Sequence, residues 1–572
     1  MTQALPSGAP EILADLAAGR LENARRTLRA LVAREPALPW PWQLLAATCW
    51  QAEPLRAEIM LRRTLVLSPG DLSALTALVA TMEKGGRASE AGRELRQIVA
   101  LSPNDDACMA TLANVVSSPT VWVLRALGVR PESDDLALLA ITRLLAIGDA
   151  AAAARIGAGR LSSSPQILAS QICTSFLLEE AHPHTSLRLA RHFNERFARP
   201  LTSNGPLRQR FRTGSGKVRI GYVAGRSFGL HTTAFTLSPT IEGHDRGAAE
   251  VFCYSDLPVS SRDEITERFA AASSGFRDVS GLSDEAVARA IAEDRIDAVI
   301  DCLGYPQGSR LLALARRPAP LQIHWPLMGS LGLDAVDVVL GDRWITPEGA
   351  ERWFSETLVR LPLAYVYDPL RPLSDIGPAP SRDVVFGSFN QLAKLSRRTV
   401  RLWSRILRGF PRSRLLLKTP GLADTEARSR VKTLFAEEGT DPGRIELRPP
   451  TRNFEEHMAS YADIDIALDP TPYGGVITTL EAMWMGVPVV TLAGDRVLGR
   501  YGHAFVSALG LSQLSAADED DYVAKALALA ENETGRAVLR TSLRERMRAS
   551  PICDGRAMAA SIEAAIRGLL RS

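Results

Sequence analysis

A regular spacing of prolines and alanines constrains the first third of this 572-residue chain more than any other feature. Both residue types recur at steps of 33 and 34 residues: Pro36, Pro69 and Pro103, together with Ala24, Ala57 and Ala91. Amphipathic patterns such as ARRTLRALVAREP and AEIMLRRTLVLSP lie between them. Helix pairs repeated in this way each expose an apolar face that only the next pair covers, so they form arrays. The spacing therefore predicts a helical array, an α-solenoid, over residues 1–204.

The repeat unit, with Ala inside its second helix and Pro after it, resembles the tetratricopeptide repeat. After Pro103 the pattern slips by 28 residues and resumes less clearly at Pro131, Pro165 and Pro200. An irregular helical bundle with coincidental prolines is the alternative interpretation.

Beyond residues 205–217, which we interpret as a linker, the pattern changes to alternating strands and helices. The predicted strands are 218–225, 248–256, 296–304, 383–391, 413–420, 443–450, 464–470 and 487–494. Short β-rich runs separated by helical stretches indicate parallel, doubly wound sheets. A proline-rich segment, 366–382, separates the two sets of strands. We therefore expect an α plus α/β chain, in which lobes 218–365 and 383–572 face each other across a cleft in the glycosyltransferase-B (GT-B) architecture.

Composition excludes several classes of protein. The 67 Lys and Arg nearly balance the 64 Asp and Glu, which argues against a nucleic-acid partner. The six cysteines include no CxxC pair, so we expect no metal site and no disulfide framework. The most apolar stretch, 136–147, contains Arg143 and is too short to span a bilayer. Because the N-terminal residues also lack a signal-peptide pattern, we expect a cytoplasmic protein without a membrane span.

A transferase that uses a nucleotide sugar must hold the nucleotide, offset charge on the departing phosphate and orient the acceptor hydroxyl. Residues 465–490 predict a strand ending at Asp469, a glycine-rich turn and a helix from about Ile477 to just before Gly486. Glycines allow close approach to a phosphate, and the helix start binds anions. The candidate donor-binding residues of this stretch are Gly475, Thr478, Thr479 and Glu481. An ordinary strand–turn–helix with capping threonines is the alternative.

Four further stretches carry candidate residues. Asn390, Gln391 and Lys394 follow a predicted strand, where a lysine can offset diphosphate charge, although a lysine in such a place is usually solvated. His231 follows the strand 218–225 and suits proton handling, although an isolated histidine is more often structural. Its strand lacks the GxGxxG fingerprint of dinucleotide enzymes. His457 and Arg500 could reach the nucleotide or its phosphates.

Together these stretches resemble the catalytic region of the protein O-linked N-acetylglucosamine transferase family. The strings that carry the resemblance are SFGLHTT, ARRPAPLQIHW, FSETLVRLP, FGSFNQLAK, EEHMASYADIDIALDP and ITTLEAMWMGVPVVTLAGDR, and it covers roughly residues 217–550. The resemblance implies a metal-independent, inverting transfer from a UDP-sugar to Ser or Thr hydroxyls, without a cofactor. The acceptor would be a protein held by the helical array.

The resemblance also implies roles for single residues. His231 matches a histidine at the sugar and acceptor end of the cleft, where it is a base or an orienting group. Lys394 matches the lysine on the donor diphosphate. The remaining positions match nucleotide- or phosphate-contacting residues (Gln391, His457, Thr478 and Glu481) and an arginine that the family carries after its last cleft strand (Arg500).

The sequence departs from the family pattern at three places. Val476 and Ile477 replace polar residues of the phosphate turn, WPLMGS at 325–330 is one residue short, and Tyr305 stands where bacterial relatives commonly have histidine. These departures leave alternatives open. Relatives with short arrays modify flagellin with CMP-nonulosonic acids, so flagellin is a candidate acceptor. A catalytically decayed scaffold and a transferase acting on small molecules are further alternatives.

Overall fold

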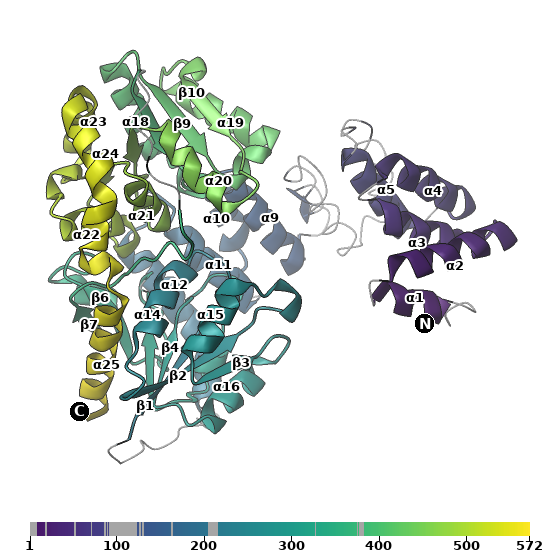
Figure 1. The fold of residues 1–572 in the computed structure, drawn as a ribbon, viewed down its shortest axis with the longest axis horizontal. Helices are drawn as coiled ribbons and strands as arrows, with labels where there is room; N and C mark the ends of the chain where they lie inside the picture. Colours follow the sequence, from purple (N-terminus) through teal and green to yellow (C-terminus); the bar gives the residue numbers. More distant parts are fainter. Residues whose placement is uncertain are drawn as a thin grey trace. The chain divides into compact units, whose positions relative to one another are not determined.

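A computed structural model describes residues 9–17, 20–50, 53–69, 71–84, 131–161, 164–203, 216–326, 328–373 and 383–571, together with residues 87, 90, 120, 123–124, 127–128 and 376. The chain forms two compact units, Met1–Arg143 and Leu144–Ser572, coloured from purple to yellow along the sequence in Figure 1. Each unit is described by itself below.

The first unit is a series of helices in which each packs against the next, as the repeat predicts. Its helices are α1 (Ala9–Ala17), α2 (Leu21–Arg34), α3 (Pro39–Cys49), α4 (Pro54–Leu67) and α5 (Leu72–Lys84). Ala24 and Ala57, the small residues of the repeat, are completely buried. They lie in one apolar cluster with Leu28, Leu45 and Leu61. The third predicted repeat, with Ala91 and Pro103, and the cysteine at 108 lie outside the described residues.

A second group of helices belongs to the larger unit. After α9 (Asp134–Ala146) come α10 (Ala150–Ala158), α11 (Pro165–Ser175), α12 (Pro183–Phe193), a π-helical turn (Asn194–Ala198) and α13 (Arg199–Ser203). We call α10 to α13 the helical layer. It contacts loops of both lobes of the unit: Thr202 Oγ1 donates to the carbonyl of Ala315 (2.7 Å), and Arg496 Nη1 donates to the carbonyl of Leu178 (3.0 Å).

The boundary between the compact units therefore falls at Arg143, inside the segment 1–204 that the repeat marks as one array. The reason is shared burial. Gly332 approaches α12 so closely that an added Cβ would lie 2.7 Å from the carbonyl carbon of Ala190. Asp149 pairs with Arg430 at 3.2 Å. Helical periodicity cannot reveal which neighbour a helix packs against.

The first sheet is entirely parallel, with strand order β3-β2-β1-β4-β5-β6-β7. Its strands are β1 (Val218–Val223), β2 (Ala249–Ser255), β3 (Gly275–Asp278), β4 (Ala298–Asp301), β5 (Leu321–His324), β6 (Val338–Asp342) and β7 (Thr357–Leu361). Its connecting helices are α14 (Ala234–Gly243), α15 (Glu264–Ala272), α16 (Asp284–Glu293) and α17 (Leu311–Leu314). Every residue of β4, β5 and β6 is buried, as expected for strands covered on both faces.

The second sheet is also parallel, with order β10-β9-β8-β11-β12-β13. Its strands are β8 (Val385–Ser388), β9 (Arg414–Lys418), β10 (Ile445–Arg448), β11 (Ile466–Leu468), β12 (Val489–Leu492) and β13 (Ser515–Ala516). Its helices are α18 (Arg397–Gly409), α19 (Thr425–Glu437), α20 (Phe454–Ala459), α21 (Ile477–Trp484), α22 (Tyr501–Ala508), α23 (Glu519–Glu531) and α24 (Glu533–Arg548). Two parallel sheets after a helical region confirm the predicted fold class.

All eight predicted strands are present, each a little shorter than its sequence pattern. The sequence analysis missed five strands: β3, β5, β6, β7 and β13. The interlobe segment 374–375 and 377–382 and the linker residues 204–215 lie outside the described residues.

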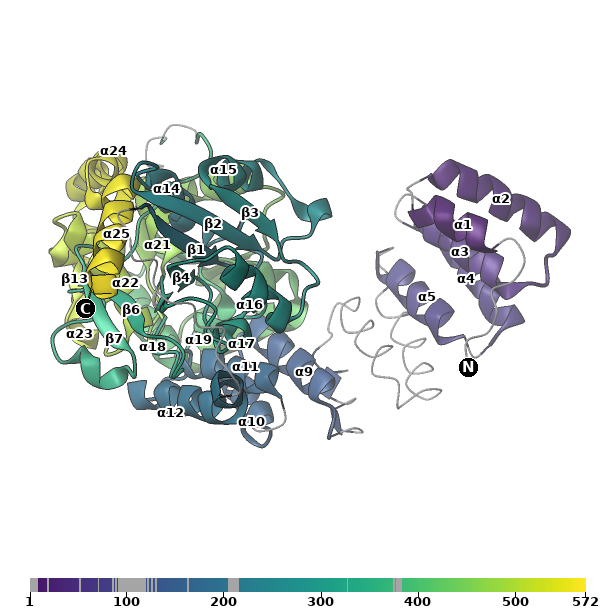
Figure 2. The ribbon, with the colours of Figure 1, turned by 90° about the horizontal axis from the view of Figure 1, so that it is seen from below.

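The chain returns to the first sheet at its end. Helix α25 (Gly555–Arg571) packs against α14, and Figure 2 shows it in yellow beside the teal strands of that sheet. The contact includes buried polar groups: His244 Nδ1 lies 2.9 Å from Glu563 Oε1, and His244 Nε2 lies 2.8 Å from the Tyr222 hydroxyl. The second lobe is thus fastened to the first by its own last helix.

No described helix is both long and apolar enough to cross a membrane. The five cysteines in the described parts of the chain are all free: Cys49, Cys173, Cys253, Cys302 and Cys553. Burial raises the pKa of the Cys173 thiol to about 12, so this thiol is not a nucleophile near neutral pH.

Two truncations test whether the helical layer is part of the larger unit. We expect a protein lacking residues 1–143 to stay folded and monodisperse. Deleting residues 1–203 also removes the helical layer and uncovers apolar surface of the lobes, such as the ring of Tyr305 that packs against Phe193. Loss of buried apolar contact is destabilising, so the shorter protein should melt lower or aggregate. Thermal unfolding and size-exclusion chromatography measure both; equal melting temperatures would contradict the assignment.

Candidate active site

The predicted residues gather where the strand order of the second sheet reverses. Strands β9 and β10 lie on one side of β8, and β11 to β13 lie on the other. The crevice at the carboxyl ends of two such strands is where open parallel sheets bind ligands. Asn390 and Lys394 follow β8, and the glycine-rich turn follows β11, so both flank this crevice.

Lys394 spans the crevice. Its Nζ donates to Asn390 Oδ1 at 3.2 Å and to the carbonyl of Gly474 at 2.9 Å. Nζ also lies 4.1 Å from the centre of the Tyr473 ring, a cation–π contact. Burial lowers the pKa of Lys394 to about 8, although Asp469 opposes this change. The ammonium is therefore still charged at neutral pH but is poorly compensated, and an added anion would stabilise it.

The turn between β11 and α21 leaves a helix start open to a ligand. Helix α21 begins at Ile477, as predicted, and Val476 before it provides no side-chain cap. The first N–H groups of a helix have no intrahelical partner and attract anions. A Cβ on Gly475 would lie 2.2 Å from Thr479 Oγ1, so only glycine fits there. The replacement of polar residues at 476 and 477 removes side-chain donors but keeps these backbone donors.

The two threonines of α21 have different partners. Thr478 Oγ1 donates to Asn390 Oδ1 at 3.0 Å and thereby joins the Lys394 cluster. Thr479 Oγ1 donates to the buried Asp469 Oδ1 at 2.7 Å. Burial raises the pKa of Asp469 to about 6. Thr478 thus links α21 to Asn390 beside Lys394, whereas Thr479 holds the turn together.

A second polar cluster lies next to the first, over the carboxyl end of β9. His457 on α20 contacts Lys418 through Nδ1 (2.7 Å) and Glu481 through Nε2 (3.2 Å). The Tyr461 hydroxyl also donates to Glu481 Oε2 at 3.1 Å. The ring of Phe389 lies beside both His457 and Tyr461. An aromatic surface edged by hydrogen-bonding groups suits a nucleoside.

His231 lies in the first lobe, after β1, at that sheet's own reversal of strand order. The backbone N–H of Thr233 donates to its Nδ1 at 3.3 Å, and the Ser227 hydroxyl lies 3.1 Å away. Because a backbone N–H can only donate, the neutral ring carries its proton on Nε2. Desolvation lowers the pKa of His231, which favours this neutral form. Part of the His231 side chain nevertheless remains open to solvent.

Two predicted residues stand apart from the clusters. Arg500 donates through Nε to the carbonyl of Trp344 (2.6 Å) and through Nη1 to that of Gly494 (2.8 Å), so its guanidinium bridges the lobes. The side chain of Gln391 is exposed and makes no hydrogen bond with the described parts of the chain. The side chains of Arg500 and Gln391 therefore take no part in the contacts within the Lys394 and His457 clusters.

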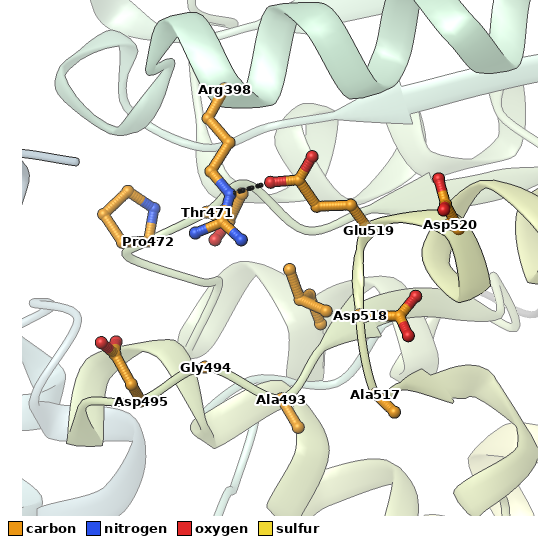
Figure 3. A pocket seen from close by; sticks show the side chains of 11 residues that line it. Arg398, Thr471, Pro472, Ala493, Gly494, Asp495, Ala517, Asp518, Glu519 and Asp520 are labelled. Carbon is orange, nitrogen blue, oxygen red and sulfur yellow. Dashed lines mark hydrogen bonds and ion pairs between the residues drawn. The ribbon is translucent and has the colours of Figure 1, made fainter. Parts of the chain in front are cut away.

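A separate cavity of about 480 Å³ lies on the other side of the turn, at the ends of β12 and β13. Figure 3 shows Thr471 and Pro472 in its wall and Arg398 paired with Glu519. Its charged lining groups are that arginine and four carboxylates: Asp495, Asp518, Glu519 and Asp520. Like charge repels an anion, so this cavity does not suit a diphosphate. Among the described residues, no group of three or more His, Cys, Asp and Glu could hold a metal ion.

Comparison with known proteins identifies the family. The model of glycosyl transferase family 41 matches residues 203–369 and 377–562, more than half of the chain. The chain belongs to this family. Both segments coincide with the two parallel sheets, so the match covers the crevice described above.

Individual members of glycosyl transferase family 41 resemble the chain over different lengths. It is 35% identical over 361 residues to a tomato (Solanum lycopersicum) protein named probable UDP-N-acetylglucosamine–peptide N-acetylglucosaminyltransferase SPINDLY. It is 30% identical over 371 residues to the Arabidopsis thaliana protein SEC, which has the same enzyme name. Each match covers 62% of this chain, and the chain spans about two fifths of the length of these curated relatives.

A solved structure matches nearly the whole chain. The O-GlcNAc transferase of Thermobaculum terrenum, solved as a mutant, has a TM-score of 0.71 and 30% sequence identity, and the match covers 94% of this chain and 98% of that one. The helical region followed by two Rossmann-like sheets is therefore shared with this relative.

Sequence reasoning missed Lys418, which the structure places in the second cluster. The sequence offered one signal, since Lys418 is the last residue of a strand whose other core residues are leucines. In a parallel sheet that position faces the ligand edge. Tyr461 and Tyr473 were missed because aromatic residues near strands are usually core residues.

Replacing Thr479 tests its structural role. Thr479→Val removes the hydroxyl that donates to buried Asp469, which should cost about 1–3 kcal/mol. Because the folded-state pKa of Asp469 is raised to about 6, protonation is favoured in the fold, and stability falls as pH rises through 6. The Thr479 hydroxyl stabilises the charged form of Asp469 more than the protonated form. The loss of stability in Thr479→Val should therefore be larger at pH 8 than at pH 5.

Thermal unfolding at both pH values measures this effect. Thr478→Val is the matched control, because the hydroxyl of Thr478 faces Asn390 rather than a buried carboxylate. A loss of stability that is equal in the two variants, or independent of pH, would contradict the assignment.

Proposed function

We propose that the protein is a protein O-glycosyltransferase that transfers N-acetylglucosamine from UDP-N-acetylglucosamine to Ser or Thr hydroxyls, with inversion of configuration. The observation that carries the proposal is Lys394, a half-buried cation joined to the glycine-rich turn ahead of an uncapped helix start. A cation and free helix N–H groups together fit a diphosphate leaving group. The names of the curated relatives support the choice of sugar and nucleotide.

The two clusters would bind different parts of the donor. Lys394, Thr478 and the start of α21 would hold the diphosphate and stabilise the charge that develops as it departs. Phe389, His457 and Glu481 would hold the nucleoside, with the carboxylate accepting from hydroxyl groups. Lys394 and the helix start would thus supply the positive charge that faces the diphosphate.

We assign His231 an orienting role. Its Nδ1 is occupied by a backbone donor, so Nε2–H is a hydrogen-bond donor rather than a proton acceptor in this arrangement. It could therefore align an oxygen of the donor or of the acceptor. Acting as a general base would first require the other tautomer.

For the acceptor we propose only its class, a protein. A helical array of the first unit would hold a cytoplasmic protein acceptor, in keeping with the peptide acceptors that the relatives' names print. No contact in the described residues favours flagellin or a CMP-nonulosonic acid, and these stay predictions of the sequence.

A thermal-shift titration with UDP, UDP-N-acetylglucosamine, GDP and CMP tests the nucleotide. A ligand that binds only the folded state stabilises it by about 2.7 kcal/mol at a concentration 100 times its Kd. We expect UDP and its sugar conjugate to raise the melting temperature. Stabilisation by CMP alone would transfer the proposal to a nonulosonic acid donor, and a response to none of the four would favour a decayed scaffold.

Replacing Lys394 tests the leaving-group role. Lys394→Ala should lower kcat/KM by about 10²–10³-fold, the usual cost of losing one group that stabilises transition-state charge. Sugar transfer to protein from labelled donor measures this loss. Lys432→Ala, on the exposed surface of α19, is the matched control and should transfer normally. Unchanged turnover in a folded Lys394→Ala protein would remove this residue from the mechanism.

A further inference from the structure

Lys418 is a buried cation that has no role in the proposed reaction described above. It ends β9, is 3% exposed, and its Nζ lies 2.7 Å from His457 Nδ1 and 3.3 Å from Thr451 Oγ1. Nζ also lies 5.3 Å from the centre of the Phe389 ring. Burying a lysine is expensive, so a residue of this kind calls for an explanation.

The contacts of Lys418 fix the direction of a chain of hydrogen bonds. A charged ammonium can only donate, so His457 Nδ1 must accept and the ring proton must lie on Nε2. Nε2–H then donates to Glu481 Oε2, which also accepts from the Tyr461 hydroxyl. Two donors on one oxygen fix the orientation of the Glu481 carboxylate.

The second oxygen of this carboxylate is left for a ligand. Within the described parts of the chain, Glu481 Oε1 takes no hydrogen bond, and the residue is 4% exposed. An ionised carboxylate can only accept. The chain of hydrogen bonds from Lys418 therefore ends in an acceptor directed at a group that donates, such as a sugar hydroxyl.

We propose that Lys418 is a positioning residue of the nucleotide site: through the His457 tautomer it holds the Glu481 carboxylate in place as an acceptor for a hydroxyl of the donor. The inference rests on the proposed function, because it takes the crevice to be the nucleotide site. Lys418 itself needs no contact with the nucleotide.

The charge of Lys418 makes this arrangement dependent on pH. Burial lowers its pKa to about 8, and Arg448 on β10 acts in the same direction, whereas Glu481 on α21 opposes them. The other titratable groups that face this chain of hydrogen bonds are His457 on α20 and Tyr461 beyond it. A neutral amine can donate to Nδ1 or accept from Nδ1–H, so it no longer fixes the tautomer of His457. In the Nδ1–H tautomer the lone pair of Nε2 faces the carboxylate, and Glu481 loses this donor.

Isothermal titration with UDP between pH 6.5 and 9.5 tests the inference. Lys394 and Lys418 both have pKa values of about 8, so the wild-type Kd should rise above pH 8 with a slope exceeding one proton. Lys418→Arg keeps a permanent donor and should bind within about threefold of wild type at pH 7, with the slope reduced to about one proton. Lys418→Met should bind about tenfold more weakly at pH 7.

Controls separate positioning from folding. Lys432→Met, a surface lysine, should match the wild type at every pH, and all variants should melt at similar temperatures at pH 7. If Lys418→Met is unstable, the Lys418→Arg pH profile still decides the matter, because a merely structural lysine would not change the slope. An unchanged slope in Lys418→Arg, or wild-type affinity in folded Lys418→Met, would overturn the inference.

The tautomer can also be observed without a nucleotide. With ¹⁵N-labelled histidine, the ring nitrogens of His457 in the wild type should show a protonated Nε2, and Lys418→Met should shift the balance toward Nδ1–H. An Nδ1–H tautomer in the wild type would overturn the inference even if UDP binds. A wild type with the expected tautomer that binds no UDP would instead overturn the proposed function.

Discussion

Parallel strands all end at the same edge of their sheet, and the candidate site depends on this constraint. Strands β9, β8 and β11 are neighbours in the second sheet, so the residues that follow them meet although they lie far apart in the sequence. Lys418, Asn390 and Asp469 are such residues. The hydrogen bond from Lys394 to Gly474 then joins two loops that no local interaction would bring together.

The sequence revealed the parts of the fold that have a strong local pattern. The strand at 464–470, its glycine turn and the helix from Ile477 were predicted because hydrophobic run, turn residues and helix start follow each other directly. The strand β3, with sequence GFRD, was missed because it is short and only half-buried at best. Strand β5, LQIH, was missed because its Gln and His are buried in an otherwise apolar layer, where pattern alone suggests a loop.

The same limit applies to the site. Lys394 could be proposed from its place after a strand, and Glu481 from its place about one turn after a helix start. Lys418 was missed because a terminal lysine on a strand usually reaches solvent, whereas here its Nζ contacts His457 of α20. Arg500 shows the converse: its position suggested a phosphate contact, yet its guanidinium joins the lobes through two carbonyl groups.

The return of α25 to the first sheet has a consequence for synthesis on the ribosome. The strands of the first sheet leave the ribosome long before residues 555–571 are made, yet α25 covers part of α14 and supplies the Glu563 partner of His244 Nδ1. Until translation reaches this helix, the first lobe exposes that face of α14 and lacks the partner of His244 Nδ1. Such exposed surface invites aggregation, so the nascent chain should be a client of chaperones up to its final helix.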